Sequence, residues 1–127
     1  MIASDIMTRK VATIYPQASA QEAAQLLDER RISGAPVIDV DGKIIGIITE
    51  ADIISKVNRE GLCVADIMSK NVIAISEETP VSDIAALLTE RKIKRVPVVS
   101  DGKLVGIVSR ADIVHAVAQG HLIIRQW

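Results

Sequence analysis

The sequence predicts a mixed α/β fold, of the α+β type, made of two β-α-β-β-α repeats packed as a pseudo-twofold pair. Three observations predict it. The chain repeats itself, each copy has apolar residues at helical spacing, and each copy has an Asp-Gly turn between two short apolar runs. We place the first repeat at residues 1–60 and the second at 61–127. Because a copy of roughly 55 residues would bury too little surface alone, we expect one compact module with a shared core.

The repeat runs through the whole of each copy. Ser4–Thr8 returns as Ala65–Ser69, and Gly46–Ile53 returns as Gly106–Ile113. The second copy lacks one residue beside its Asp-Gly turn, where the length of a loop changes at little cost. The pattern indicates a tandem duplication.

Each copy begins with a short extended piece, predicted at 11–14 and at 72–75. A helix follows, predicted at 19–31 and at 80–92, where apolar residues recur every three or four positions. The polar stretch 58–61 is interpreted as the linker between the copies.

The helix starts carry recognisable caps. Ser19 with Glu22 makes a capping box, and Thr79 before Pro80 gives a capping residue followed by a proline at the first helical position. These signals predict that both helices begin near residues 19 and 80.

A hairpin and a second helix complete each copy. Asp41-Gly42 and Asp101-Gly102 are strong two-residue hairpin signals between apolar runs. The second helix is predicted to start after Thr49 in the first copy and after Ser109 in the second.

The composition excludes several classes of protein. The chain of 127 residues is 49% hydrophobic and 24% charged, has a formal net charge of -1, and contains no Phe, one Tyr (Tyr15) and one Trp (Trp127). A chain without net positive charge is poorly suited to neutralising phosphates, and one with two aromatic residues is poorly suited to stacking on bases. A nucleic-acid partner is therefore not expected. The lone Cys63 allows no internal disulfide and fits a reducing compartment. With no apolar run of roughly 18 residues and no signal-peptide core, we expect a cytoplasmic protein without a membrane partner.

Other candidates for chemistry are weak. His115 and His121 lack the spacing and carboxylate neighbours of a metal site, and no Ser/His/Asp arrangement indicates catalysis. We therefore expect neither a metal nor an enzyme. The duplicated Met7 and Met68 are interpreted as packing residues.

The segments Gly46–Asp52 and Gly106–Asp112 share one form, in which a hydroxyl residue stands three positions before an aspartate. One interpretation is a helix start, with Thr49 or Ser109 as the cap and the aspartate complementing the helix dipole. The other is a ligand site, because a helix N-terminus favours an anion and an aspartate accepts hydrogen bonds from neighbouring ribose hydroxyls. The duplication favours the second without excluding the first.

Taken together, these motifs resemble a tandem pair of CBS domains (the cystathionine β-synthase motif), also called a Bateman module. The resemblance rests on the duplicated Asp-Ile-Met, on the strands Ala35–Val37 and Val96–Val98, and on both Gly-to-Asp segments. It covers about residues 3–57 and 64–118. It implies a regulatory module that binds adenine nucleotides in clefts between the repeats.

The resemblance also implies roles for individual residues. Asp52 and Asp112 match ribose-binding aspartates, and Thr49 and Ser109 match the hydroxyls beside ribose or phosphate. The backbone around Thr13 and Ala74 matches the segments that read the adenine edge. With no Phe in the chain, aliphatic side chains would sandwich the base, namely Val11, Ile47, Ile73 and Ile107.

The copies differ where phosphates would bind. Lys94-Arg95 in the second copy resembles the basic pair that meets phosphates in some family members, whereas the first copy has Ser33-Gly34. Arg110 replaces Glu50 and is a further candidate. An ordinary solvated surface remains the alternative interpretation of these cations.

The sequence therefore leaves two functional hypotheses. The first is a regulatory module that senses AMP, ADP, ATP or S-adenosylmethionine as an effector, with no cofactor required and an unknown regulated protein as a further partner. The second is a structural or dimerisation module that has kept the fold without binding nucleotides. In either case the apolar residues of the second helices predict a homodimer with C2 symmetry, namely Ile53, Ile54, Val57, Ile113, Val114 and Val117.

Overall fold

The structure, a computed structural model, describes residues 1–122 and confirms a fold of mixed helices and strands. Trp127 and the end of the second predicted repeat lie outside the described residues. The chain divides into two compact units. Unit 1 holds residues 1–10, 73–101 and 105 onward, and unit 2 holds residues 11–72 and 102–104. These bounds differ from the repeats predicted at 1–60 and 61–127, because each repeat's first segment packs with the other repeat's hairpin.

Unit 2 is built on an antiparallel hairpin of β1 (Gly34–Ile38) and β2 (Ile44–Thr49). A parallel bridge places Ile14 on the outer side of β1, and an antiparallel bridge places Ser69 on the outer side of β2. The extended piece predicted at 11–14 therefore pairs with the sheet only at its last residue.

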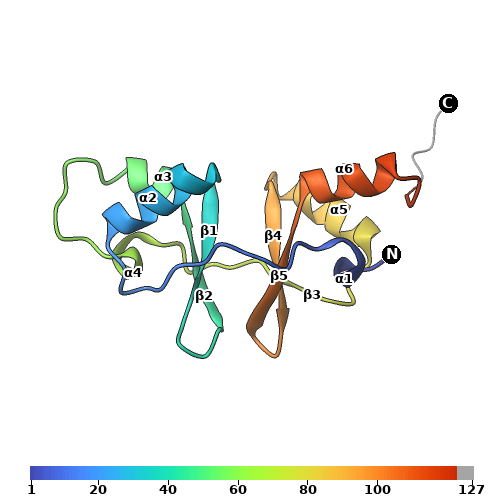
Figure 1. Ribbon diagram of the computed structural model, residues 1–127, viewed down its shortest axis with the longest axis horizontal. Coiled ribbons are helices and arrows are strands. Elements are labelled where there is room, and N and C mark those ends of the chain that lie inside the picture. The colour runs from blue at the N-terminus through green and yellow to red at the C-terminus, as the bar shows by residue number, and fades with distance from the viewer. Residues whose placement is uncertain (123–127) are drawn as a thin grey trace. The chain divides into compact units, whose positions relative to one another are not determined.

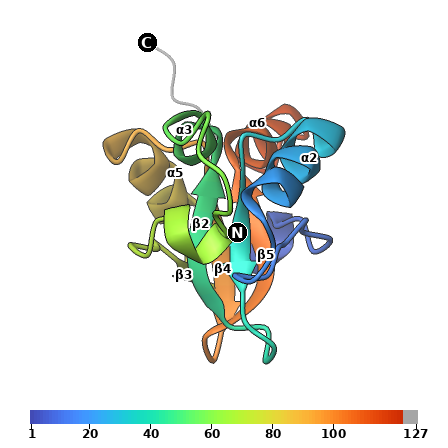
Figure 2. The same ribbon diagram turned by 90° about the vertical axis from the view of Figure 1, so that its left-hand side faces the viewer.

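Three helices accompany this hairpin: α2 (Ala20–Arg30), α3 (Glu50–Ile54) and the single turn α4 (Val64–Ile67). Figure 1 shows α2 and α3 near the end of the hairpin where β2 stops, with the hairpin loop at the opposite end. Figure 2 shows the same two helices from the side. α3 follows β2 directly and packs against α2 at this end of the hairpin.

Unit 1 repeats this plan. Its sheet has the order β3 (Ile75–Ser76), β4 (Arg95–Ser100) and β5 (Lys103–Ser109), with β3 parallel to β4 and the first two residues of β5 counted with unit 2. Thr8 forms an antiparallel bridge to the outer side of β5, as Ser69 does to β2. The helices of unit 1 are the single turn α1 (Ala3–Ile6), α5 (Val81–Glu90) and α6 (Arg110–Ala118).

Each unit has a hydrophobic cluster of buried residues. The cluster of unit 1 joins Ala3 and Met7 to buried residues of the second repeat. The cluster of unit 2 joins Val64 and Ile67 to buried residues of the first repeat, with Met68 packed against them. The repeats therefore share their cores by exchanging their first segments. The interpretation of Met7 and Met68 as packing residues is confirmed.

Two glycines admit the exchanged segments. A Cβ at Gly46 would lie 2.6 Å from the Met68 sulfur and 2.9 Å from the Ser69 carbonyl oxygen. A Cβ at Gly106 would lie 2.7 Å from the Met7 sulfur. Because real Cβ atoms do not approach other atoms so closely, glycine at both positions lets a neighbouring chain segment lie against the strand.

The residue missing from the second repeat changes the type of turn. In the second hairpin Asp101 (φ 52°) and Gly102 (φ 78°) are both left-handed, as a two-residue type I′ turn requires. In the first hairpin only Gly42 (φ 81°) is left-handed, and the Asp39 carboxylate accepts hydrogen bonds from the backbone N–H groups of Asp41 and Lys43, both at 2.9 Å. The longer loop thus depends on a side chain, and the shorter one on backbone conformation.

The cap of the first long helix is confirmed, because Ser19 Oγ accepts a hydrogen bond from the Glu22 N–H at 3.0 Å. The prediction for the second was wrong. Pro80 is the capping residue, and Thr79 instead accepts a hydrogen bond from the Ser76 N–H at 3.1 Å. The reason lies in the exchanged segment, since the Val81 N–H donates to the carbonyl oxygen of Met1 at 3.0 Å and needs no side-chain partner.

Candidate functional site

The candidate site in unit 2 lies where β2 ends and α3 begins. Thr49 has an extended backbone and caps α3, with its Oγ1 accepting a hydrogen bond from the Asp52 N–H at 3.3 Å. In return, Asp52 Oδ2 accepts hydrogen bonds from the Thr49 N–H at 2.8 Å and from the Thr49 hydroxyl at 2.9 Å. The cap interpretation of this motif is therefore correct.

Unit 1 repeats this geometry between β5 and α6. Asp112 Oδ2 accepts hydrogen bonds from the Ser109 N–H at 2.8 Å and from the Ser109 hydroxyl at 3.0 Å, and the Asp112 N–H donates to Ser109 Oγ at 3.2 Å. The two copies keep the same three bonds although one uses threonine and the other serine.

Capping uses only some of the hydrogen-bond acceptor positions of each aspartate carboxylate. An ionised carboxylate has about four acceptor positions on its two oxygens, and the cap uses only Oδ2. Asp52 and Asp112 are both partly exposed. Among the described residues, Asp52 Oδ1 accepts no hydrogen bond, and Asp112 Oδ1 accepts one, from the Thr8 hydroxyl at 3.4 Å. A helix cap and a hydroxyl-binding site can therefore coexist in the same aspartate.

The first-strand residues lie one strand further from the cap. The Ile14 N–H donates to the Pro36 carbonyl oxygen at 3.1 Å, which places Thr13 beside β1 on the side away from β2. Ala74 precedes β3, which lies beside β4 on the side away from β5. Thr13 is partly buried and Ala74 is exposed. The four aliphatic residues expected to sandwich a base are all partly exposed: Val11, Ile47, Ile73 and Ile107.

The sequence candidates thus fall into two groups. Unit 2 contains Thr13, Thr49 and Asp52, of which Thr49 and Asp52 are in contact. Unit 1 contains the other six, in which Ser109 contacts Asp112 and Arg110 contacts Lys94: Ala74, Lys94, Arg95, Ser109, Arg110 and Asp112.

The cations of unit 1 gather where β4 starts and α6 begins. The Arg110 N–H donates to the Lys94 carbonyl oxygen at 3.0 Å, and the Arg110 Nε–H donates to the Ile93 carbonyl oxygen at 3.1 Å. Lys94 and Arg110 are exposed, and Arg95 is partly buried. The start of α6 therefore lies beside the backbone of Lys94, which immediately precedes Arg95 at the start of β4.

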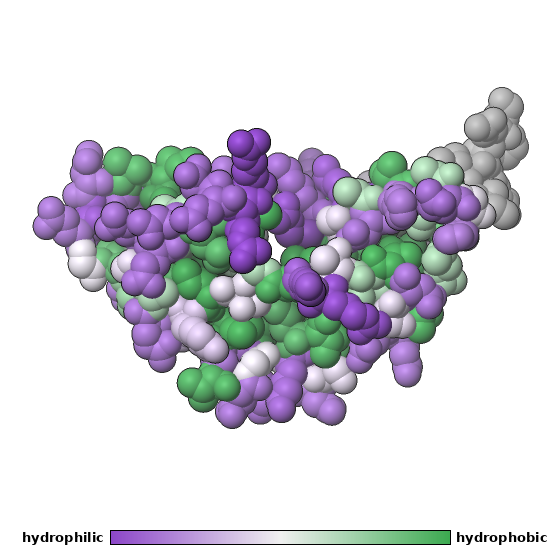
Figure 3. Space-filling view, viewed as in Figure 1, coloured by the Kyte–Doolittle hydropathy of each residue, from purple (hydrophilic) through white to green (hydrophobic). Residues whose placement is uncertain are grey.

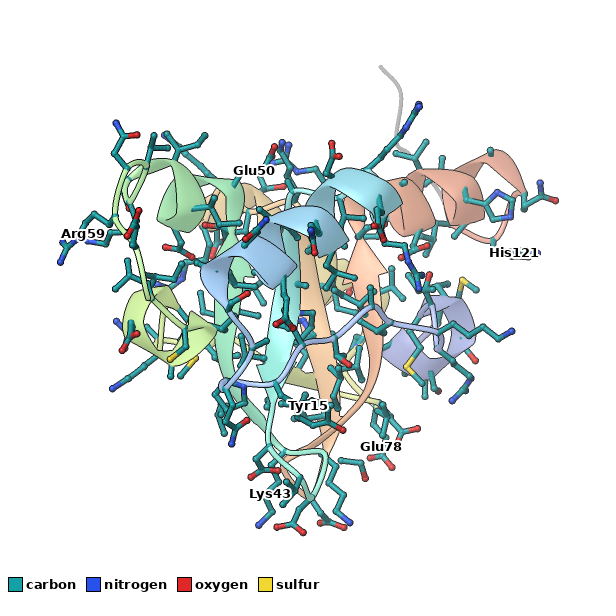
Figure 4. The ribbon with its side chains drawn as sticks, turned by 60° about the vertical axis from the view of Figure 1, so that its left-hand side comes forward. Tyr15, Lys43, Glu50, Arg59, Glu78 and His121 are labelled. Carbon is teal, nitrogen blue, oxygen red and sulfur yellow. The ribbon has the colours of Figure 1, made fainter. Side chains whose placement is uncertain are left out.

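Unit 2 has the same backbone link without the charges. The Glu50 N–H donates to the Ser33 carbonyl oxygen at 3.0 Å, as Arg110 does to Lys94. Figure 4 shows Glu50 at the end of the hairpin opposite Lys43. A Cβ at Gly34 would lie 3.1 Å from the Ile48 carbonyl oxygen, so this position has little room for a side chain. The equivalent of Lys94, Arg95 and Arg110 is here a serine, a glycine and an acid.

Sequence reasoning missed the contact of Thr8 with Asp112. The sequence signal for this contact is a hydroxyl residue directly after the duplicated Asp-Ile-Met, Thr8 in the first copy and Ser69 in the second. A hydroxyl at the same position of both copies indicates a hydrogen-bonding role.

A shallow pocket of about 310 Å³ lies between α2 and α3 of unit 2. Its lining is Ala24, Leu27, Asp28, Arg31, Glu50, Ile53 and Ile54. Neither Thr49 nor Asp52 lines it, so this pocket is not the carboxylate site.

The remaining candidates show no site in the described residues. No three His, Cys, Asp or Glu side chains come together there as a metal site requires. No helix within residues 1–122 is both long and apolar enough to cross a bilayer. Cys63 precedes α4, and hydrogen bonds from its backbone N–H and its side chain lower the pKa of Asp66 below the ordinary 3.8.

Comparisons with known proteins agree on one family. Residues 3–59 and 64–119 each match the CBS domain. The CBS domain-containing protein CBSX1, chloroplastic, of Arabidopsis thaliana is 33% identical over an alignment that covers 91% of this chain and 63% of that protein. The L-aspartate semialdehyde sulfurtransferase of Methanocaldococcus jannaschii is 35% identical, with 88% of this chain and 22% of that protein covered. The chain thus spans less than two thirds of either relative.

Two solved structures resemble the chain over nearly their whole length. A crystal structure of CBSX2 in complex with AMP has a TM-score of 0.88 and 32% identity, and covers 95% of this chain and 98% of that one. The CBS domain pair of protein MJ0100, in complex with 5′-methylthioadenosine and S-adenosyl-L-methionine, has a TM-score of 0.82 and 33% identity, with 94% and 98% covered. In both structures the ligands contain adenosine.

Proposed function

Because the chain belongs to the CBS domain family, we propose that it is a regulatory module that binds adenosine-containing ligands such as AMP, ADP, ATP or S-adenosylmethionine. The observation that carries the proposal is the duplicated cap that leaves Oδ1 of Asp52 and of Asp112 with acceptor positions to spare. The ligands of CBSX2 and MJ0100 support it. A ribose supplies two neighbouring hydroxyl donors, which suit such an acceptor.

In the proposed complexes Asp52 and Asp112 accept hydrogen bonds from ribose hydroxyls. Thr49 and Ser109 lie beside the ribose or the phosphate. The backbone near Thr13 and Ala74 reads the adenine edge, and partly exposed aliphatic side chains cover the faces of the base.

Lys94, Arg95 and Arg110 are proposed to bind phosphate. A phosphate gains charge-assisted hydrogen bonds from such a group, and two of these side chains are exposed. At the corresponding positions of the first repeat, Glu50 repels phosphate, and Ser33 and Gly34 carry no charge. The protein is therefore expected to hold phosphate mainly through second-repeat residues.

The module is proposed to act by binding alone, with no cofactor required and no reaction of its own, and to pass the effect to an unknown regulated protein. A cytoplasmic location fits its single cysteine. The competing hypothesis is a scaffold that has lost the ligand, and a binding experiment separates the two.

The test is ligand-induced stabilisation. At a hundredfold excess of AMP over its Kd, the wild-type protein should gain about 2.7 kcal/mol of unfolding free energy. The double variant Asp52→Asn, Asp112→Asn keeps the shape of both side chains, and it should fold while losing most of that gain. If no adenine nucleotide shifts the wild-type unfolding transition, the scaffold hypothesis is correct and both aspartates serve as caps only. Release of phosphate or adenine from bound ATP would contradict a role without chemistry.

We also propose that the protein forms a homodimer with C2 symmetry through the helices that follow the hairpins. Large apolar side chains are exposed to water there, with Ile54 at the end of α3 68% exposed, Val57 just beyond it 65% and Val114 in α6 66%. Hydrophobic surface is visible over both α3 and α6 in Figure 3. Sedimentation should find a dimer at tens of micromolar, an order-of-magnitude concentration for a stable contact. A monomer under those conditions would contradict the proposal.

A further inference from the structure

The first eight residues of the chain, called the leading segment below, dock on unit 1. Two adjacent backbone groups donate to this unit, the Ala3 N–H to Thr79 O at 2.8 Å and the Ser4 N–H to Glu77 O at 2.9 Å. Thr8 and Ile107 exchange two further backbone bonds, at 2.8 and 2.9 Å. Ala3 is completely buried in the core of the unit. The leading segment is therefore an integral part of unit 1.

The leading segment ends at the candidate ligand site. The Thr8 hydroxyl donates to Asp112 Oδ1 at 3.4 Å, on the oxygen that the cap leaves free. This contact joins residues 104 positions apart in the chain. Asp112 is thus held at one oxygen by the start of its own helix and at the other by the leading segment.

The equivalent contact is missing from unit 2. Ser69 pairs with Ile47 through the same two backbone bonds, both at 2.9 Å. Within the described residues, however, no hydrogen bond joins the Ser69 hydroxyl to Asp52. Among these residues, Asp52 is thus held by hydrogen bonds at Oδ2 only, whereas Asp112 is held at both oxygens.

We propose that Thr8 is a positioning residue for Asp112, and that ligand binding at Asp112 is thereby coupled to docking of the leading segment. The inference rests on the proposed function. A carboxylate held at both oxygens loses less freedom when a ribose binds, so the hydroxyl of Thr8 strengthens ligand binding at this site alone. By thermodynamic linkage, a ligand that binds more tightly when Thr8 is bonded to Asp112 also stabilises the docked leading segment.

The first experiment measures AMP binding by calorimetry in an Asp52→Asn background, where the weakened first site leaves the Asp112 site as the tighter one. Thr8→Val replaces the hydroxyl by a methyl group of similar size, and it should weaken AMP by about two- to tenfold, the value of one hydrogen bond. Thr8→Ser restores the hydroxyl and should restore the affinity. Ser69→Ala is the matched control, and it should leave the affinity unchanged.

The second experiment distinguishes positioning from simple support of the fold. Hydrogen exchange of the Ala3, Ser4 and Thr8 amides should slow when AMP is added to Asp52→Asn, and the slowing should be reduced in Thr8→Val. If Thr8 only supports the fold, Thr8→Val should bind AMP with the same affinity as the Asp52→Asn protein that keeps Thr8. Its unfolding midpoint without ligand should nevertheless be lower.

Each outcome decides between the two claims. Unchanged AMP affinity in Thr8→Val overturns the inference and leaves the proposed function intact. If wild-type protein binds AMP but Asp52→Asn does not, Asp112 holds no ligand and the inference also fails. If the wild type itself binds neither AMP nor S-adenosylmethionine, the proposed function fails first.

Discussion

The starts of α3 and α6 carry the same hydrogen bonds and differ in what surrounds them. Both aspartates receive two bonds on Oδ2 from the capping residue, at nearly identical distances. In unit 1 the Thr8 hydroxyl donates to Asp112, and the cations Lys94, Arg95 and Arg110 belong to the same unit. In unit 2 Glu50 replaces Arg110, and within the described residues no hydrogen bond joins the Ser69 hydroxyl to Asp52. The cap is thus the invariant part of the duplication. The two repeats have diverged in the residues that surround it, which allows two sites of one origin to prefer different ligands.

The largest expected effect comes from removing each carboxylate in turn. Asp52→Asn and Asp112→Asn each lose a charge-assisted acceptor worth about 1.5–3 kcal/mol, which lowers the affinity of its own site about ten- to a hundredfold. Calorimetry with AMP should show one class of sites weakened in each variant. A 2′-deoxy ligand on wild-type protein should reproduce the loss. Two variants that bind AMP as the wild type does would show that the carboxylates are caps only.

A second comparison concerns the glycines that admit the exchanged segments. Gly46→Ala and Gly106→Ala should each destabilise the fold by about 1–3 kcal/mol, the usual cost of overpacking. Gly46→Ala should cost more, because its Cβ would lie 2.9 Å from a backbone carbonyl oxygen, against 3.1 Å at Gly106. Urea unfolding measures both. Val40→Ala, at a side chain 86% exposed, is the control and should change stability by less than about 0.5 kcal/mol. The reverse order of the two glycine variants would contradict the packing argument.

A third comparison uses the charge difference between the repeats. Arg95→Ala should weaken ATP by about tenfold and AMP by less, because the loss grows with the charge on the ligand, and the effect should be larger at low salt. Lys43→Ala removes one positive charge at the hairpin loop, far along the strand from the start of α3, and serves as the control (Figure 4). Equal losses for AMP and ATP would rule out a phosphate role for Arg95.

The smallest effect concerns the cap of α4. Hydrogen bonds from Cys63 lower the pKa of Asp66, so the ionised form stabilises the folded state. That contribution is fully present above the ordinary pKa of 3.8 and disappears as the pH falls through the lowered value. Asp66→Asn should therefore unfold at slightly lower urea than the wild type at pH 7, and the difference should vanish toward pH 2. A difference that persists in acid would mean that the charge of Asp66 plays no part.

The duplication made most of the fold predictable. A pattern that occurs twice, with Asp-Gly turns and helical periodicity in each copy, fixes the order of elements even where single signals are weak. The start of the first long helix at Ser19 followed from local chemistry alone. Thr79 failed as a cap because its helix begins against the backbone of Met1, a contact between residues 80 positions apart that no local rule contains.

The site divides in the same way. Each capping residue stands three positions before its aspartate, as in Thr49 with Asp52 and Ser109 with Asp112. Because this geometry is local, it could be predicted from the sequence. Thr8 reaches Asp112 only because the leading segment docks on β5, which depends on tertiary structure. Residues that act across the chain in this manner leave only an indirect trace, here a hydroxyl repeated at equivalent positions.

The exchange of first segments also sets an order of events during synthesis. Ala3 and Met7 leave the ribosome early, yet their partners in the core of unit 1 extend to Val108, about a hundred residues later. Until then the leading segment has nothing to dock on, whereas unit 2 has all but its last three residues, 102–104, once residue 72 is made. Contacts of such long sequence separation slow folding, because the entropy of closing a large loop is lost before they form. Unit 2 is therefore expected to become ordered first. The turn that ends at Met68 can dock soon after it is synthesised, whereas the equivalent turn that ends at Met7 docks only after about a hundred further residues. A nascent chain arrested after residue 100 should resist proteolysis in residues 11–72 and be cleaved in residues 1–10.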